Sequence, residues 1–134
     1  MEFDLIATST MGLEAVVSRE LEALGYENQI IGTGRVLFRG DISAICRANI
    51  WLRTAGRVLI RIGSFSATDF GELFDRTHEL PWERWIPADA AFPVKGRSHK
   101  SQLSSVPACQ KMVKKAVCLI LIKFQVVQKK KSAL

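Results

Sequence analysis

Histidine and cysteine are scarce in this sequence of 134 residues, which has two histidines and three cysteines. The cysteines, Cys46, Cys109 and Cys118, are odd in number and show no CxxC spacing. Structural zinc sites need such spacing together with further cysteine or histidine ligands, and a disulfide framework needs an even number of cysteines. We therefore expect unpaired thiols in an intracellular protein, and no bound metal.

Long uninterrupted apolar runs are also missing. The longest apolar segment, residues 116–127, contains Lys123 and Gln125 and is too short to cross a membrane. The first four residues include Glu2 and Asp4, whereas a signal peptide begins with basic residues. The sequence therefore predicts a soluble, cytoplasmic protein with no membrane partner.

Catalytic motifs are absent too. Residues 32–34 (GTG) lack the third glycine of a GxGxxG loop, because Leu37 occupies that position, and they indicate a hairpin turn. Residues 69–71 (DFG) have the letters of a kinase motif without its catalytic loop. A nucleophile and base pair of Cys109 and His99 would lack an orienting carboxylate nearby in sequence. We expect no catalytic residue and no bound cofactor in this chain.

Acidic residues are missing after Asp89, and lysines are missing before Lys95. Residues 1–94 carry thirteen acids and nine arginines, a net charge of −4, whereas residues 95–134 carry ten basic residues and no acid. A solvated lysine-rich surface would normally include glutamates. The asymmetry therefore favours a polyanion-binding C-terminal part.

The first 66 residues show the pattern of a small α+β unit. Strands are predicted at residues 3–7, 28–31, 35–39 and 58–65, with helices at 13–24 and 42–52. For the first helix we expect a cap from the hydroxyls of residues 8–10 and an end at Gly25. For the second we expect a cap from Asp41, with five residues sharing one side: Ile42, Ile45, Cys46, Asn49 and Leu52. The order β-α-β-β-α-β is the ferredoxin-like arrangement.

A second unit begins near residue 67. Asp69 and Glu72 have capping-box spacing before a helix that reaches about Thr77. An aromatic connector (residues 80–87), a strand (91–95), a loop (96–105) and a helix from Pro107 to about Leu119 are predicted after it. This unit stops before a sheet can close, and residues 119–134 lose the amphipathic pattern of a helix.

The basic segment, residues 94–117, holds the candidate binding residues. The loop contributes Lys95, Arg97, Ser98, Lys100 and Ser101, whose cations and hydroxyls suit phosphate groups. Lys111, Lys114 and Lys115 follow i, i+3, i+4 spacing and share one helix face, so that Val106, Met112, Val113, Ala116 and Val117 can face inward. This pattern is typical of a surface that binds the nucleic-acid backbone, although a phospholipid or an acidic partner could use it too.

Three tryptophans and three further arginines each allow two interpretations of their role. Trp51, Trp82 and Trp85 could stack on bases, but the core is the commoner place for tryptophan in so small a protein. The arginines at positions 53, 57 and 61 either extend the basic surface or form ion pairs with surface acids.

Four stretches together carry a family resemblance: LIATSTMGLEAVVSRELEALGYE, RVLFRGDISAICRANIWLRTAGRVLIRIGSF, FGELFDRTHELPWERWIPADAAFPVKGRS and KSQLSSVPACQKMVKKAV. From about Asp4 to Val117 the chain closely resembles the N-terminal part of bacterial THUMP-domain RNA methyltransferases of the ribosomal RNA guanine-N2 group. The resemblance implies an N-terminal ferredoxin-like domain (1–66) and a truncated α/β THUMP domain (67–118) that contacts RNA, before an atypical tail (119–134).

In that family a catalytic domain follows, and S-adenosylmethionine (SAM) is its implied cofactor. This sequence departs from the family after Val117 and lacks the catalytic domain, so we expect a chain shortened by truncation or frameshift and inactive alone. The implied partner is structured RNA, ribosomal or transfer. THUMP modules also occur in tRNA-modifying enzymes such as the thiolating ones, which gives one alternative. A non-catalytic protein-interaction remnant, anchored by Trp82 or Trp85, is the other.

Overall fold

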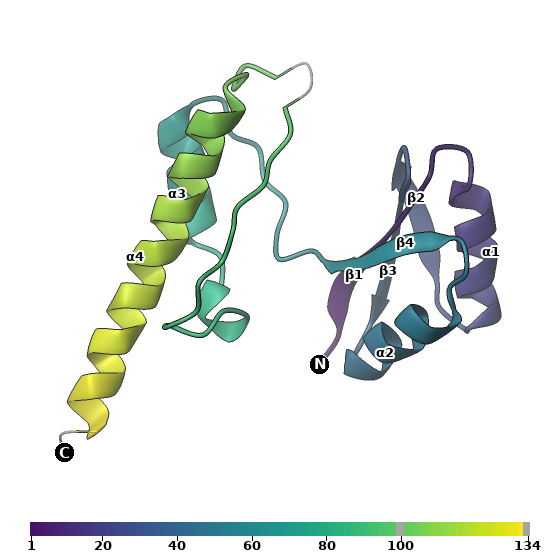
Figure 1. The fold of residues 1–134 in the computed structure, drawn as a ribbon, viewed down its shortest axis with the longest axis horizontal. Helices are drawn as coiled ribbons and strands as arrows, with labels where there is room; N and C mark the ends of the chain where they lie inside the picture. Colours follow the sequence, from purple (N-terminus) through teal and green to yellow (C-terminus); the bar gives the residue numbers. More distant parts are fainter. Residues whose placement is uncertain (99–100, 133–134) are drawn as a thin grey trace. The chain divides into compact units, whose positions relative to one another are not determined.

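The structure is a computed structural model that describes residues 1–98 and 101–132, without the side chains of residues 122–132. It has two compact units, Met1–Arg61 and Ile62–Leu134, which Figure 1 shows in sequence colours. Both units contain helices, and the first also contains a sheet, so the fold is of the mixed α and β class that the sequence predicts.

The first unit confirms the predicted β-α-β-β-α-β order. Its four strands form one antiparallel sheet in the order β2-β3-β1-β4, with the first strand in the middle. The two helices follow the first and third strands (Figure 1). The elements are β1 (Phe3–Ser9), α1 (Glu14–Ala23), β2 (Asn28–Gly32), β3 (Arg35–Gly40), α2 (Ile42–Trp51) and β4 (Ala55–Ile60).

The core of this unit lies between the helices and one face of the sheet. Both helices contribute to the same buried cluster as the central strands, so they cover the same face. Side chains alternate along a strand, so the intervening strand residues lie on the opposite face, away from the helices. The buried cluster consists of Leu5, Ala7, Val17, Leu21, Val36, Phe38, Ala44 and Ala48.

The start of α1 differs from the prediction, whereas its end agrees. Leu13 occupies the N-cap position without a side-chain cap bond, and Thr8 and Ser9 belong to β1 instead. The Thr8 hydroxyl is committed to the neighbouring strand, because its Oγ1 accepts the Arg57 N–H at 3.1 Å. Gly25, with φ of +90°, follows the C-terminus of α1 as predicted.

Helix α2 has its predicted cap, but the five residues that spacing places on one side are not buried alike. Asp41 Oδ1 accepts the Ala44 N–H at 3.0 Å, which confirms the cap. Ala44 and Ala48 are buried, whereas Ile42 is 68% exposed and Cys46 is exposed. The helix lies so close to β3 that a Cβ on Gly40 would collide with the Ala44 side chain. Only a small residue fits at this contact, and the half-buried Ile45 and Leu52 pack against the core beside it.

Strand β4 also begins and ends earlier than predicted. It pairs with β1 from Ala55 to Ile60, and the next ladder bond is the one that the Arg61 N–H donates to the Asp4 carbonyl at 2.8 Å. Beyond Arg61 little of β1 remains to pair with, because β1 begins at Phe3. The predicted strand at residues 61–65 is therefore wrong.

The second unit contains α3 (Phe70–His78), the short 3-10 helix η1 (Trp82–Arg84) and α4 (Val106–Ser132). Asp69 Oδ1 accepts the Glu72 N–H at 2.7 Å, which confirms the predicted helix start. The strand predicted at residues 91–95 is wrong, since these residues have no regular structure. A strand needs a neighbour that completes its hydrogen bonds, and the described part of the chain places none beside this segment.

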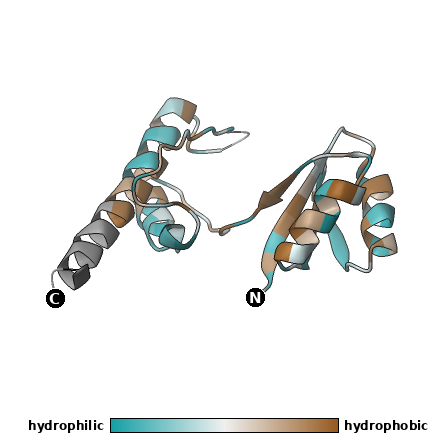
Figure 2. Ribbon diagram, turned by 60° about the horizontal axis from the view of Figure 1, so that its bottom comes forward, coloured by the Kyte–Doolittle hydropathy of each residue, from teal (hydrophilic) through white to brown (hydrophobic). Residues whose placement is uncertain are grey.

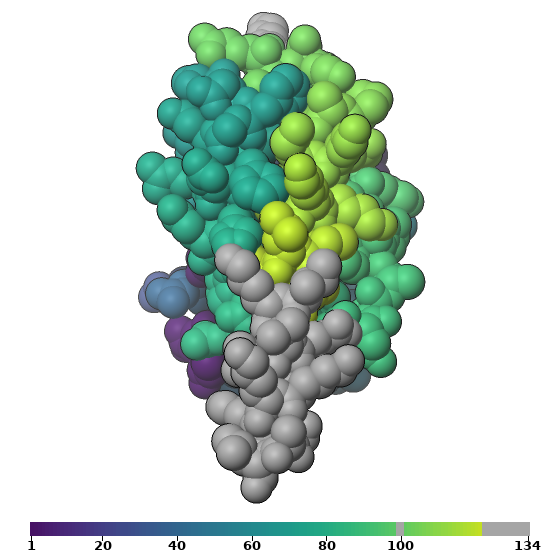
Figure 3. Space-filling model, turned by 90° about the vertical axis from the view of Figure 1, so that its left-hand side faces the viewer, coloured from purple at the N-terminus to yellow at the C-terminus, as the bar shows by residue number. Residues whose placement is uncertain are grey.

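Helix α4 continues well beyond the predicted end near Leu119. No glycine or proline occurs between residues 108 and 132, so nothing in the local sequence interrupts the helix. It packs against α3 and η1, and Figure 3 shows α3 and α4 side by side. Its buried residues are Ala116, Val117 and Leu121. Among the described residues, no helix is long and apolar enough to cross a membrane.

Candidate nucleic-acid interface

The loop before α4 keeps its cations exposed but uses its serines internally. Lys95 and Arg97 are exposed. The Ser98 hydroxyl donates to the Leu103 carbonyl at 2.8 Å, and the Leu103 N–H donates to Ser101 Oγ at 3.1 Å. These bonds hold a compact loop, so the cations are the groups best placed to meet a phosphate. Lys100, also a candidate, lies outside the described residues.

The first turns of α4 separate charge from apolar residues as the spacing predicts. Lys111, Lys114 and Lys115 are exposed, while Ala116 and Val117 are buried. Val106, Met112 and Val113 are half-buried. Figure 2 shows this alternation of hydrophilic and hydrophobic residues along the described part of α4. The predicted face is confirmed, and contact of this face with RNA remains a prediction.

Lys114 differs from its two neighbours because it has partners within the chain. Its Nζ donates to the Phe92 carbonyl at 2.9 Å and lies 5.2 Å from the centroid of the Phe92 ring. The contact ties the irregular segment around Phe92 to α4, beside a hollow of about 430 Å³. Lys114 therefore has a structural role that sequence spacing does not reveal.

No acidic group neutralises this surface among the described residues. Three ion pairs occur in the described part of the chain, and none involves the basic segment. The segment also has no acid in its own sequence. Its positive charge is thus available to an anionic partner, and interactions of this kind weaken steeply with added salt.

The three tryptophans differ in how far they are exposed to solvent. Trp82 Nε1 donates to the Thr77 carbonyl at 2.7 Å, and both Trp82 and Trp85 are half-buried. Trp51, at the end of α2, is 59% exposed, so the expectation that tryptophans lie in the core is wrong for this residue.

A second group of basic residues lies on the open face of the sheet, opposite the helices. Arg61 pairs with Asp4 at 3.1 Å, and so does Arg39 at 3.3 Å. Arg57 and Arg35 have no ion pair among the described residues. Sequence reasoning considered Arg57 and Arg61 but missed Arg35 and Arg39. The missed signal is their even spacing along a predicted strand, which places both on one face.

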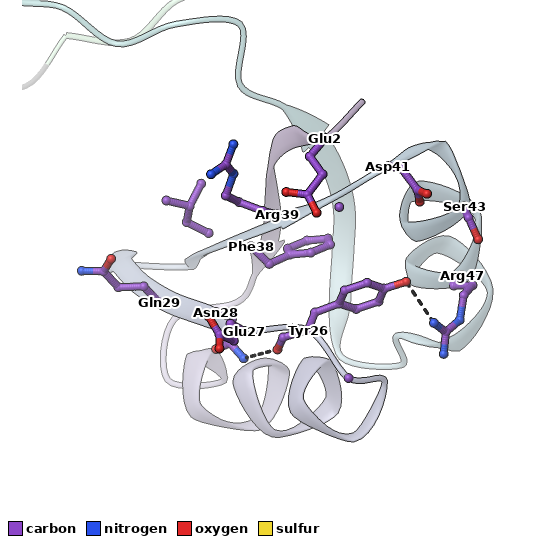
Figure 4. Close-up of a pocket in the computed structure, with 13 residues that line it drawn as sticks. Glu2, Tyr26, Glu27, Asn28, Gln29, Phe38, Arg39, Asp41, Ser43 and Arg47 are labelled. Atoms are coloured by element: carbon purple, nitrogen blue, oxygen red, sulfur yellow. Dashed lines mark hydrogen bonds between the residues drawn. The ribbon is translucent and has the colours of Figure 1, made fainter.

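A separate hollow lies on the first unit (Figure 4). Its volume is about 830 Å³ and its lining mixes acids, including Glu2, Glu27 and Asp41, with Arg39 and Arg47. The two arginines are engaged already, Arg39 with Asp4 and Arg47 through a bond of 3.1 Å from Nη1 to the Tyr26 hydroxyl. This mixed lining does not favour a polyanion.

The described part of the chain contains no cluster of metal-ligating side chains. No group of three or more histidine, cysteine, aspartate or glutamate side chains is close enough there to hold a metal ion. Cys46 is exposed, and Cys109 and Cys118 are half-buried, each without a disulfide. The Cys109 thiol donates to the Leu103 carbonyl at 3.9 Å, at the start of α4.

Two domain families match this chain. Residues 4–59 match the family described as the RlmL ferredoxin-like domain, and residues 67–126 match the THUMP domain. The THUMP match therefore extends nine residues beyond Val117, where the sequence was expected to leave the family. Together with the β-α-β-β-α-β topology, these matches confirm the predicted resemblance.

Curated relatives and solved structures agree with this assignment. The chain is 52% identical over 116 residues to the "Putative RNA methyltransferase YpsC" of Bacillus subtilis, covering 87% of this chain and 30% of that protein. It is 31% identical over 117 residues to the ribosomal RNA large subunit methyltransferase K/L of Methylococcus capsulatus, covering 87% and 16%.

Two crystal structures are similar as well. One, described as a "predicted N6-adenine-specific DNA methylase" from Listeria monocytogenes, has a TM-score of 0.89 and 52% identity, covering 93% of this chain and 33% of that one. The other, SMU.472, described as a "putative methyltransferase complexed with SAH", has a TM-score of 0.81 and 44% identity, covering 87% and 31%.

The chain thus spans about a third or less of each of these relatives. The part that it matches in the curated relatives is their N-terminal part. This chain therefore contains an RlmL ferredoxin-like domain and a THUMP domain, and it is similar to the N-terminal part of relatives that are named as RNA methyltransferases.

Proposed function

We propose that this chain binds structured RNA through the basic segment and serves as the RNA-binding part of a SAM-dependent RNA methyltransferase. The observation that carries the proposal is the exposed lysine face of α4, next to the cationic loop, in a chain that matches the THUMP family. The candidate contact residues are Lys95, Arg97, Ser98, Lys100, Ser101, Lys111, Lys114 and Lys115. We assign Ser98, Ser101 and Lys114 a mainly structural role in this surface, because each forms a hydrogen bond within the chain.

The proposed RNA class and target atom are based on the relatives and on the family resemblance. Ribosomal RNA is the proposed substrate because the K/L relatives are named for the large ribosomal subunit, and guanine N2 is the proposed target from the family resemblance. A transfer RNA substrate is the alternative within the same class. We propose domain limits of 1–66 and 67–118, with residues 119–134 as a tail, and a cytoplasmic location where such RNAs are modified.

SAM is implied by the methyltransferase relatives, one of which is described as complexed with SAH. The described residues of this chain do not fit that cofactor. The hollow on the first unit is lined by a mixture that includes carboxylates and guanidinium groups, and the sequence has no glycine-rich loop. We therefore propose that SAM binds a part of the relatives that this chain does not cover.

The proposal is tested by titrating an RNA hairpin with the full chain at two salt concentrations. We expect binding that weakens steeply with salt, since each phosphate contact adds about 0.7 to 0.9 to the slope of log K against log salt. Changing Lys111, Lys114 and Lys115 together to Glu should abolish it. A control that changes Arg19, Arg47 and Arg84 to Glu alters the charge equally at other positions and should retain most of the binding.

Two results would contradict the proposal. Absence of RNA binding by a chain whose circular dichroism shows it to be folded would exclude the basic segment as a sufficient RNA site. RNA binding that does not weaken with salt and that depends on Trp51, the exposed tryptophan of α2, would also contradict it, because the contact would then be base stacking and not the basic segment.

A further inference from the structure

The open face of the sheet in the first unit carries an ordered set of cross-strand rows. In the first row Arg35 and Arg57 flank Thr8, and in the last row Arg39 and Arg61 flank Asp4. Residues directly opposite each other on paired strands project to the same side of a sheet. The row between them is aliphatic and consists of Leu37, Ile6 and Leu59.

The two charged rows differ in how their arginines are neutralised. Asp4 pairs with both Arg39 and Arg61, through Oδ1 at 3.3 Å and Oδ2 at 3.1 Å, so this row keeps one net positive charge. Thr8 is neutral, and Arg35 and Arg57 are exposed and form no ion pair among the described residues. The first row therefore keeps two net positive charges.

The face concentrates positive charge within a unit that is neutral overall. Residues 1–61 contain seven acids and seven arginines. Four of those arginines but only one acid, Asp4, belong to the three rows. Helix α1, on the opposite side of the sheet, carries three of the acids: Glu14, Glu20 and Glu22. The two sides of this unit therefore present opposite charges.

A hollow adjoins the first row. It has a volume of about 380 Å³, and its lining consists of Thr8, Ser9, Thr10, Thr54, Ala55, Gly56 and Arg57, with no acidic residue. The hydroxyls of Thr8, Ser9 and Thr54 already donate bonds within the chain. The Arg57 guanidinium is therefore the group of this lining that is best placed to bind a phosphate oxygen. The Glu20 carboxylate accepts bonds from the Thr54 hydroxyl at 2.8 Å and from the Arg53 N–H at 3.3 Å.

The distance between the unpaired arginines suits a polyanion. Arg35 and Arg57 lie on strands that flank β1, and neighbouring strands are about 4.8 Å apart, so the two backbones are about 10 Å apart. Each long side chain can therefore turn toward one phosphate group or toward two successive ones. The Arg35 guanidinium lies beside Gly32, and its Nη2 is 3.5 Å from where a Cβ on that glycine would be.

We propose that the open face of the ferredoxin-like sheet is a second RNA contact, in which Arg35 and Arg57 bind backbone phosphates and the hollow adjoins Arg57. This inference rests on the proposed function, which supplies the RNA, and extends it from the THUMP unit to the ferredoxin-like unit. RNA is favoured over an acidic protein because two exposed arginines on strands that flank β1 match a chain of regularly spaced phosphates. The last row, neutralised in part by Asp4, contributes less.

The test compares two double variants of the full chain with a fluorescent RNA hairpin over a range of salt concentrations. Arg35→Gln with Arg57→Gln should lower the magnitude of the salt slope by about 1.4 to 1.8, the contribution of two phosphate contacts. Arg19→Gln with Arg47→Gln removes the same charge from the helices on the other side of the same unit. The salt slope of this control should differ from that of the unchanged chain by less than half the contribution of one phosphate contact. Circular dichroism checks that both variants are folded.

The outcomes separate this inference from the proposed function. If the unchanged chain binds no RNA, the proposed function fails and this inference fails with it. If the Lys111, Lys114 and Lys115 variant loses binding but the Arg35 and Arg57 variant keeps the full slope, the proposed function stands and this inference is overturned. Equal losses in both double variants would also overturn it, since they would indicate a general effect of charge. Binding of polyglutamate in place of RNA, dependent on Arg35 and Arg57, would assign the face to an acidic protein.

Discussion

Lys114 gives the sharpest test of how the lysine face of α4 meets RNA. Its ammonium donates to the Phe92 carbonyl and lies over the Phe92 ring. A cation–π contact at an exposed site contributes about 0.5–1 kcal/mol, and a hydrogen bond from a charged donor contributes about 1 kcal/mol or more. An RNA phosphate that recruits Lys114 must therefore replace contacts worth roughly 1 to 2 kcal/mol, which is about fivefold to thirtyfold in affinity.

The three lysines should consequently behave differently when each is changed to Gln alone. Loss of Lys111 or of Lys115 should lower the salt slope of RNA binding by about 0.7 to 0.9. Loss of Lys114 should lower it by clearly less, because its charge is already engaged. Lys114→Gln should instead lower the free energy of unfolding by about 1 kcal/mol in urea titrations, whereas Lys111→Gln should change it by less than about 0.5 kcal/mol.

The reasoning is refuted if Lys114→Gln reduces the slope as much as Lys111→Gln while leaving stability unchanged. That pair of results would mean that the contact with Phe92 is absent in solution and that all three lysines are equivalent. Phe92→Ala offers an independent check, because it removes the ring and leaves the carbonyl. It should reproduce part of the stability loss of Lys114→Gln and leave the charge unchanged.

Three further predictions concern the ferredoxin-like unit. Phe38→Ala should lower the free energy of unfolding by about 3–5 kcal/mol in urea titrations, since Phe38 is 1% exposed in the core. Gly34→Ala should be clearly destabilising in thermal melts, because Gly34 has a φ of +69° and a Cβ there would lie 2.5 Å from the Ser9 carbonyl oxygen. The Gly34 N–H donates to Glu14 at 2.7 Å and lowers the pKa of Glu14 below its usual value. The stability that this contributes is present above the unfolded pKa and is lost as the pH falls through the folded pKa, so Glu14→Gln should destabilise the chain at neutral pH and have little effect in acid.

Local periodicity predicted most of the first unit because its elements are short and their ends are marked. Asp41 and Gly25 gave the limits of helices that the structure confirms. The buried face of α2 could not be predicted in this way. Which face is buried depends on the close approach of Gly40 to Ala44, and that contact joins two elements rather than appearing in the pattern of either one.

The candidate site was predictable to the same extent. The lysine face of α4 follows from i, i+3, i+4 spacing, so the sequence was sufficient to place it. The contact between Lys114 and Phe92 was not, because the segment around Phe92 was expected to form a strand. The rows that contain Arg35 and Arg57 depend on the register of three strands, and register is set by pairing across the sheet rather than by local sequence.

Asp4, shared between two arginines, also has an evolutionary consequence. Aspartate and asparagine codons differ by one nucleotide, and the two side chains have nearly the same shape. A change of Asp4 to Asn would release Arg39 and Arg61 at once and leave the strand and its core contacts in place. The strength with which this sheet attracts a polyanion is thus adjustable by a single mutation, so selection can raise or lower it without rebuilding the fold.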